Sequence, residues 1–295
     1  MSSELTASSV ELPDEALPDG GWVIEPRRAG LLARARDVWR YRKLLRFFAG
    51  KSLQKLYKRT VLGSAWLFIR PLFPLAVNTI VFGGMLGVGS NGVPYFLFLN
   101  VGNTAWDLFA SASMWGTRSL DLNRGLISRI YVPRLILPFA MMSPSFLNLA
   151  IQIAVLAVAL VYYRVTTGVL YLTPQHLPWA LLALAMSLLM ALGLSLWTSV
   201  PALVARDVRF TLGYVMSFWV LLTPVLYPIN LPPQYAWLLL LNPMAAIVNT
   251  FKYGVLGIEV LDLQALAIAA VLIFLLLLSG LWYFSRAEAD AADKV

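Results

Sequence analysis

Few residues of this sequence have side chains that could do chemistry, and their types exclude several kinds of active site. The chain has no cysteine and one histidine, His176. A thiol nucleophile, a disulfide scaffold, a cysteine-bound metal and a site with paired histidines are therefore excluded. Asp107 and Arg70 lie inside apolar stretches, where a charge is costly and marks a functional position by default. Arg70 can also snorkel to the cytosolic face, and neighbouring amides can satisfy Asp107.

Two glycine motifs decide whether this chain binds nucleotides. The phosphate-loop pattern G-x-x-x-x-G-K-[ST] is absent, so any ATP-driven activity needs another polypeptide. Residues 87–92 match G-x-G-x-x-G, but they follow a long apolar segment and precede Val93 and Pro94. The strand and crossover helix that give this motif its mechanism are missing. We expect a short external turn there.

The composition of the whole chain indicates a membrane protein. Of 295 residues, 59% are hydrophobic and 13% are charged, whereas about 25% are charged in a soluble domain. Six apolar segments are long enough to cross a bilayer with some tilt. We therefore predict an all-α integral membrane protein with six transmembrane helices, at residues 61–88, 95–116, 135–163, 177–204, 210–226 and 266–284.

The residues before the first span divide into two parts of opposite charge. Residues 1–25 contain six acids and no base, which predicts a disordered acidic cytosolic tail. Residues 26–60 contain twelve Lys or Arg against Asp37 alone, with apolar residues at helical spacing. This pattern predicts a basic amphipathic helix on an anionic membrane surface, with a solvated helix packed on a partner as the alternative.

The distribution of Lys and Arg indicates the orientation in the membrane. If both termini are cytosolic, 20 of the 23 basic residues fall on the cytosolic side, and Arg164 and Lys252 fall outside. The net charge of +8 is then mostly a topology signal, and we expect no nucleic-acid partner. Residues 286–295 form a cytosolic tail in this orientation.

The stretch from residue 210 to residue 251 has no charged residue but contains five prolines. Within it, Asn242 and Pro243 divide an apolar piece, residues 234–253, into halves that are each too short to span. We predict a re-entrant helical hairpin that enters from outside, between the fifth and sixth spans, and borders a pathway. The alternative is one kinked span, which would place the C-terminal tail outside.

Two further patterns suggest contacts with a partner or a substrate. Residues 119–133 predict a short helix that either docks into a groove on a partner or lies on the membrane surface as a connector. Several aromatic residues fall within spans, where they could line a pathway and stack on sugar rings, although core packing is the default role for each one alone. They are Trp106, Trp115, Trp197, Phe218 and Trp219.

Over residues 41–284 the sequence resembles the membrane subunits of ABC-2 type exporters of cell-surface polysaccharides, which include O-antigen, capsule and teichoic-acid permeases. The stretches that carry the resemblance are YKRTVLGSAW at 57–66, PL at 71–72, YVPR at 131–134, LP at 137–138, RDVR at 206–209, TPVLYP at 223–228 and LNPM at 241–244. Arg70 and Asp107 depart from the pattern, since an uncharged amide and an asparagine are expected there.

The resemblance implies a permease without catalysis of its own, with the six-span domain at residues 61–285. It implies a homodimer in the bacterial plasma membrane with two copies of a separate ATPase, which binds the ATP and magnesium, so no cofactor is expected in this chain. The implied substrate is a lipid-linked polysaccharide, such as O-antigen-like, capsular, galactan or teichoic-acid polymers.

The resemblance also implies roles for particular residues. Residues 119–133 would be a coupling helix that contacts the ATPase through Asp121, Leu122, Arg124, Leu126, Ile127, Arg129, Ile130 and Tyr131. The cytosolic entrance would bind the lipid phosphate through Arg46, Lys51, Lys55, Lys58 and Arg59. The pathway would be lined by Trp106, Asp107, Trp115, Phe218, Trp219 and Tyr227. An external gate at residues 227–257 would depend on Pro224, Pro228, Asn242 and Pro243.

Three other functions fit parts of the pattern. An ABC-2 exporter of lipids or drugs would use a lateral lipid gate instead of a long polymer channel. A membrane-embedded glycosyltransferase would need paired carboxylates or an acidic metal site, which Asp107 alone does not supply. A secondary transporter would work without an ATPase and would depend on protonation of Asp107.

Overall fold

The computed structural model describes residues 42–57, 65–127, 134–228 and 236–292, which form helices and no strand. The helices are α2 (Arg42–Tyr57), α3 (Trp66–Asn78), η2 (Thr79–Met85), α4 (Tyr95–Thr117), η3 (Asp121–Asn123), α5 (Arg124–Ile127), α6 (Ile136–Met141), α7 (Ser143–Thr167), η4 (Pro174–His176), α8 (Leu177–Val204), α9 (Asp207–Leu222), α10 (Ala236–Leu240), α11 (Pro243–Leu256) and α12 (Leu263–Ala292). The predicted acidic tail and residues 26–41 of the predicted basic helix lie outside the described residues.

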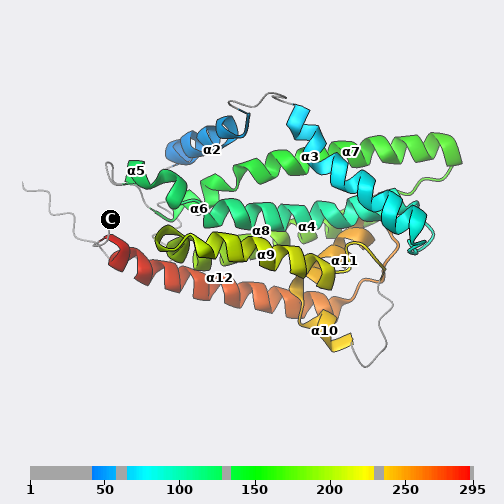
Figure 1. Ribbon diagram of the computed structural model, residues 1–295. Helices are drawn as coiled ribbons and strands as arrows, with labels where there is room; N and C mark the ends of the chain where they lie inside the picture. Colours follow the sequence, from blue (N-terminus) through cyan, green and yellow to red (C-terminus); the bar gives the residue numbers. More distant parts are fainter. Residues whose placement is uncertain (1–41, 58–64, 128–133, 229–235, 293–295) are drawn as a thin grey trace, which may run out of the picture.

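Two long helices, α4 and α8, form the centre of a bundle (Figure 1). Helix α8 packs most extensively on α4 and α12, and also on α11, while α4 packs on α7. Helix α11 comes close to α8 because Gly254 has no side chain: a Cβ there would lie 2.4 Å from the backbone nitrogen of Ala180. The bundle thus places α11 against the helices that hold most of the buried residues.

Prolines and glycines set the ends of the main helices. Pro178 lies in the first turn of α8, where a missing N–H costs nothing. Gly168 follows the last residue of α7 and Gly257 follows the last residue of α11, and each has the left-handed conformation that glycine adopts without strain. A turn at Gly87 and Gly92, both with positive φ, follows η2. The turn predicted at residues 87–92 is confirmed.

The helices bear out the predicted all-helical class, although they do not establish six spans. Four described segments are long and apolar enough to cross a membrane, at Phe68–Met85, Ile136–Thr167, Pro174–Val204 and Leu263–Arg286. Helix α4 has 23 residues, which is long enough, but carries amides and an acid. Helix α9 has 16 residues and covers about 24 Å of the roughly 30 Å of hydrocarbon. The count of six spans stays a prediction.

The break predicted at Asn242 and Pro243 is present, because α10 ends at Leu240 and α11 begins at Pro243. Whether the two pieces enter and leave on the same side of the membrane stays a prediction.

The apolar helices differ in how well the bundle covers them. Only 6% of the residues of the candidate span Phe68–Met85 are buried, against 56% of an apolar 18-residue stretch of the candidate span that contains α8.

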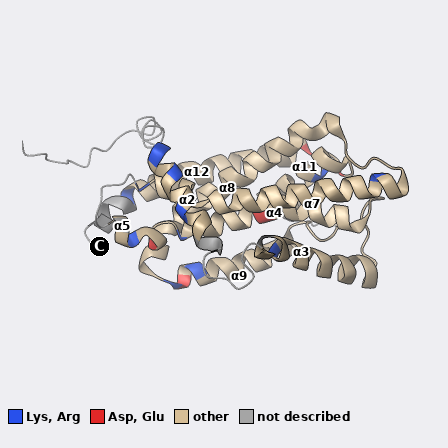
Figure 2. Cartoon of the chain, turned by 90° about the horizontal axis from the view of Figure 1, so that it is seen from above, with Lys and Arg blue, Asp and Glu red and all other residues tan. Residues whose placement is uncertain are grey.

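Most of the Lys and Arg residues that the structure describes gather at one end of the bundle, near α2, α5 and the end of α12 (Figure 2). The opposite end, with α11, carries few of them. This asymmetry is the one that the positive-inside pattern requires. The cytosolic placement of both termini remains a prediction that rests on it. Below, the end with α2 and α5 is called the basic end, and the end with α10 and α11 the hairpin end.

Candidate functional site

At the hairpin end, α9 stops at Leu222 and leaves backbone carbonyls without helical donors. Pro224 and Pro228 further reduce the number of backbone donors near these carbonyls, because proline has no N–H group. Side chains supply the missing donors instead. Tyr227 Oη donates to Leu221 O at 2.7 Å, Asn242 Nδ2 to Leu222 O at 3.1 Å, Lys252 Nζ to Pro224 O at 2.6 Å and Tyr95 Oη to Leu226 O at 2.6 Å.

Lys252 is the most deeply buried of these donors. Its side chain is 0% exposed, and its ammonium lies 3.5 Å from the centroid of the Phe98 ring in addition to its bond with Pro224. Gly102 makes room for it, since a Cβ there would lie 2.9 Å from Val225 O and 3.2 Å from Lys252 Cε. A buried charge persists only where such partners surround it. Lys252 therefore ties α11 to the turn after α9.

Asn242 connects the start of α11 to the end of α9. Its Oδ1 accepts from the backbone nitrogen of Met244 at 3.1 Å, which caps α11, and from Trp219 Nε1 at 2.9 Å. Its Nδ2 donates to Leu222 O and to Thr223 Oγ1, each at 3.1 Å. One amide thus connects the start of α11 with the last turn of α9.

The candidate gate and pathway residues occupy different environments. Pro224 and Pro228 are buried, and Tyr227 is half-buried. Phe218 is 68% exposed on α9, and Trp115 is half-buried on α4.

Trp106 and Trp219 instead belong to an aromatic cluster inside the bundle. The rings of Trp106, Phe109 and Trp219 all contact each other edge to face, with centroids 5.6 Å apart for Trp106 and Phe109, 5.4 Å for Phe109 and Trp219, and 6.4 Å for Trp106 and Trp219. Trp106 is only 5% exposed. Within this chain these rings pack against each other, as edge-to-face pairs prefer. A role in lining a pathway stays a prediction for both tryptophans.

A small pocket with room for about one water molecule lies between α3, α4 and α7. Asp107 contributes a carboxylate, and Gln152 Nε2 donates to its Oδ2 at 2.6 Å. The amide that we expected to satisfy this acid thus comes from α7, 45 residues away. The residues that line the pocket are Pro71, Leu72, Leu75, Asn100, Asn103, Asp107, Gln152 and Val155.

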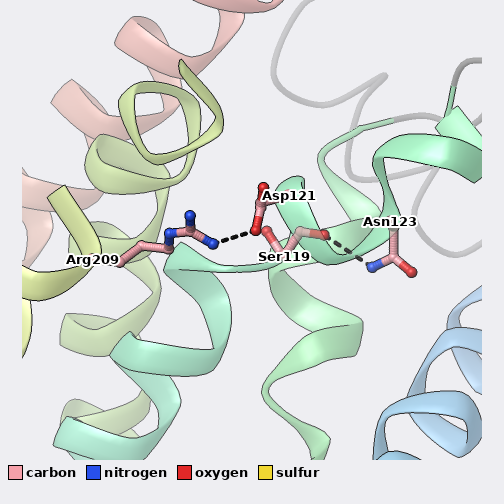
Figure 3. Close-up of polar contacts among 4 residues, drawn as sticks. All are labelled: Ser119, Asp121, Asn123 and Arg209. Carbon is pink, nitrogen blue, oxygen red and sulfur yellow. Dashed lines mark hydrogen bonds and ion pairs between the residues drawn. The ribbon is translucent and has the colours of Figure 1, made fainter. Parts of the chain in front are cut away.

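At the basic end, the segment from Asp121 to Ile127 is helical, as η3 followed by α5. Asp121 forms an ion pair with Arg209 at the start of α9 (Figure 3). Asn123 Nδ2 donates to Ser119 O at 2.9 Å, which fixes the turn after α4. The predicted coupling segment is therefore connected to α9 as well as to α4.

The other predicted coupling residues lie around this ion pair. Leu122 and Ile127 are half-buried, Ile127 packs against the main core, and Arg124 is exposed. Leu126 lies on α5. Arg129, Ile130 and Tyr131 lie outside the described residues.

Helix α2 packs on the basic end through Phe48, which is fully buried. Ser52 and Ser143 at the start of α7 share a hydrogen bond at 2.8 Å, so α2 has a fixed contact with the bundle. Arg46 on α2 is exposed and Lys51 is half-buried. Of the other predicted phosphate contacts, Lys55 lies on α2, and Lys58 and Arg59 lie outside the described residues.

Comparison with known proteins identifies the family. Residues 43–256 match the family described as ABC-2 type transporter, which is more than half of the chain. The chain belongs to this family. The predicted family is confirmed, and the ABC-2 transporter chain is accordingly a multi-pass protein of the bacterial inner membrane.

Three curated relatives are similar over most of their length, and each is named an O-antigen export system permease protein. The relative from Myxococcus xanthus is 23% identical over 266 residues, which cover 88% of this chain and 99% of the relative. A relative from Klebsiella pneumoniae is 26% identical over 255 residues, 85% of this chain and 94% of the relative. Another from the same species is 27% identical over 229 residues, 75% of this chain and 84% of the relative.

The sequence alone does not reveal what Lys252 does in this ABC-2 chain. The positive-inside pattern predicts that it lies outside, and the structure adds that it lies on α11 and is fully buried. The available signal was that Lys252 is the first charge after 42 uncharged residues. Its partner, the carbonyl of Pro224, depends on tertiary packing and leaves no sequence pattern.

A second polar contact at the hairpin end lies in the loop between α11 and α12. Asn91 Nδ2 donates to Glu259 Oε1 at 3.3 Å, which connects this loop to the turn before α4. Burial raises the pKa of Glu259, and the positive charge of Lys252 partly opposes that shift. The hydrogen bond from Asn91 therefore joins this loop to the turn before α4.

Proposed function

We propose that this chain is the transmembrane subunit of an ATP-driven exporter that moves a lipid-linked cell-surface polysaccharide out of the cytosol. The observation that carries the proposal is the similarity to O-antigen export permeases over 84–99% of their lengths. The absence of a phosphate-loop motif supports an arrangement of two kinds of subunit, in which a separate ATPase hydrolyses ATP. The working unit would be a homodimer with two ATPase copies.

The basic end supports this proposal through the contacts of its short helices. A coupling element must transmit a conformational change of the ATPase to a transmembrane helix. Residues 121–127 meet this requirement, because Asp121 is paired with Arg209 and Ile127 packs against the core. Movement of η3 and α5 would then reach α9 directly, and α9 ends at the hairpin.

The test is to purify the chain with a candidate ATPase, reconstitute the complex in lipid nanodiscs and measure ATP hydrolysis with and without a lipid-linked polysaccharide. We expect a stable complex whose hydrolysis rate rises several-fold with the glycan lipid. A rate that responds equally to sugar-free lipids or drugs would favour an exporter of those compounds. A chain that purifies alone and transports without ATP would contradict the proposal.

A further inference from the structure

The small pocket between α3, α4 and α7 contains a carboxylate whose charge no neighbouring side chain cancels. Asp107 accepts a hydrogen bond from Gln152, but among the residues that the structure describes it forms no ion pair with a Lys or Arg. A hydrogen bond from a neutral amide satisfies an oxygen without neutralising its negative charge. A charge between apolar helices is costly unless an opposite charge lies beside it. Either a proton or a cation therefore has to neutralise Asp107.

Other side chains with oxygen atoms line the pocket beside this carboxylate. Asn100, Asn103 and Asp107 lie three and four residues apart on α4, so they share one face of the helix, and all three line the pocket. Gln152 on α7 lines it as well, and because its Nε2 donates to Asp107, its Oε1 stays available as an acceptor. No donor among the described residues bonds to Asn103 or to Oδ1 of Asp107. Two helices thus supply a carboxylate and amide groups to one small pocket.

The size of the pocket and its single carboxylate together select the kind of ion. The pocket has room for about one water molecule, and a bare sodium or potassium ion is no larger than that. Hard cations of this kind prefer carboxylate and carbonyl oxygens as ligands. Magnesium usually keeps several waters, for which the pocket has no room. A divalent ion would also leave one positive charge in excess of the carboxylate.

We propose that this pocket binds one monovalent alkali cation, with Asp107, Asn103 and Gln152 as ligands that connect α4 to α7. The ion neutralises the carboxylate and stabilises the contact between the two helices. It also accounts for a departure from the ABC-2 pattern, in which an asparagine is expected at position 107, because a neutral amide there needs no counter-ion. The inference goes beyond the proposed function and does not depend on which substrate the exporter moves.

The test measures ion binding by the full chain in nanodiscs of a zwitterionic lipid. The probes are radioactive sodium and, in place of potassium, radioactive rubidium, with choline as the replacing cation at constant ionic strength. Binding is compared for the parent chain and for Asp107→Asn and Asn103→Leu. Two controls are matched to these changes. Asn148→Leu alters a half-buried amide on α7, one turn from Gln152, that does not line the pocket, and Asp262→Asn removes an exposed carboxylate.

We expect saturable binding of about one ion per parent chain, and the more tightly bound of the two ions is the ligand. Asp107→Asn should weaken binding more than about tenfold, because it removes the charge that attracts the ion. Asn103→Leu should weaken it about threefold, as the loss of one neutral ligand does. Both controls should bind as the parent does. The unfolding midpoint of the parent should rise when the bound ion replaces choline, and that of Asp107→Asn should not.

Asp107→Asn keeps the shape of the side chain and an acceptor for Gln152, so the variant should fold, and its midpoint in choline checks this. Three outcomes would overturn the inference. The parent could show no saturable binding of either ion, or Asp107→Asn could bind as tightly as the parent. The third outcome is an infrared band of a protonated carboxyl group that is present in the parent with either ion and absent in Asp107→Asn, which would show that a proton neutralises Asp107. None of these measurements involves transport, so each outcome leaves the proposed function to its own test.

Discussion

The hairpin end and the basic end of the bundle both contain breaks between helices, but different kinds of contact connect the helices at the two ends. After α9, four side chains from separate parts of the chain donate to four carbonyls, and Lys252 among them is completely buried. At the basic end, η3 and α5 are connected to α9 by the ion pair of Asp121 with Arg209, whose side chains are 28% and 19% exposed.

This difference indicates which end can rearrange at low cost. If the hairpin end lies at membrane depth, as the sequence predicts, its carbonyls have no water to bond, and movement there requires a new set of donors. A partly exposed ion pair contributes little and can be replaced by water. We therefore expect movement to begin at the basic end and the hairpin end to resist it. The predictions below test this contrast.

Asn242→Ala should have the largest effect on stability. The change removes a helix cap worth about 1 kcal/mol and three hydrogen bonds to the end of α9 at about 0.6 kcal/mol each. We expect a loss of about 3 kcal/mol, measured as a lower midpoint of thermal unfolding in detergent. Asn242→Asp is the control, since it keeps the acceptor for Met244 and Trp219 and should retain part of the stability. An unchanged midpoint for Asn242→Ala would contradict the role of this amide.

Lys252→Met should have the next largest effect. The change leaves the carbonyl of Pro224 without a donor, at a cost of about 1–2 kcal/mol, while it relieves the cost of burying an ammonium. Lys43→Met, at an exposed position on α2, is the matched control and should leave the midpoint unchanged. If Lys252→Met raised the midpoint instead, burial of the charge would outweigh the bond, and the hairpin end would be less firmly held than we infer.

The apolar pattern of the sequence was enough to place most helices. The predicted fourth span, residues 177–204, coincides with α8, because a proline at its start and the charges beyond its end mark both boundaries. The fifth span was placed at 210–226, whereas α9 runs from Asp207 to Leu222. Hydropathy excluded the charged first turn and included the turn at Pro224, where missing N–H groups end the helix.

The candidate site was less predictable than the helices. Pro224 and Asn242 could be selected from the sequence because proline and asparagine have local effects on the backbone. The pairing of Gln152 with Asp107 joins α7 to α4, and the bond from Lys252 joins α11 to the turn after α9. Contacts of this kind depend on how the helices pack, and a single sequence contains no periodic pattern that reveals them.

At the basic end, Arg209→Ala and Asp121→Ala should each change the unfolding midpoint only slightly. A partly exposed pair of this kind contributes about 0.2–1 kcal/mol. Their effect should appear instead in ATP hydrolysis by the complex, which we expect to respond less to the glycan lipid. The double exchange Asp121→Arg with Arg209→Asp should restore the response, and Arg206→Ala, an exposed neighbour, should leave it intact. A large loss of stability in either single variant would remove the contrast between the two ends.

The smallest effect concerns the pH dependence of the hairpin end. Burial raises the pKa of Glu259 above its ordinary value, so the folded chain holds this proton more tightly than the unfolded chain does. The resulting stability is fully present at pH values below the ordinary pKa of a glutamate, and it is lost as the pH rises through the raised pKa. Glu259→Gln should therefore flatten the decline of the unfolding midpoint over this range. Asp262→Asn, in the same loop, keeps the acceptor for Ala265 and controls for loss of a negative charge. A decline that persists in Glu259→Gln would place the responsible group outside this loop.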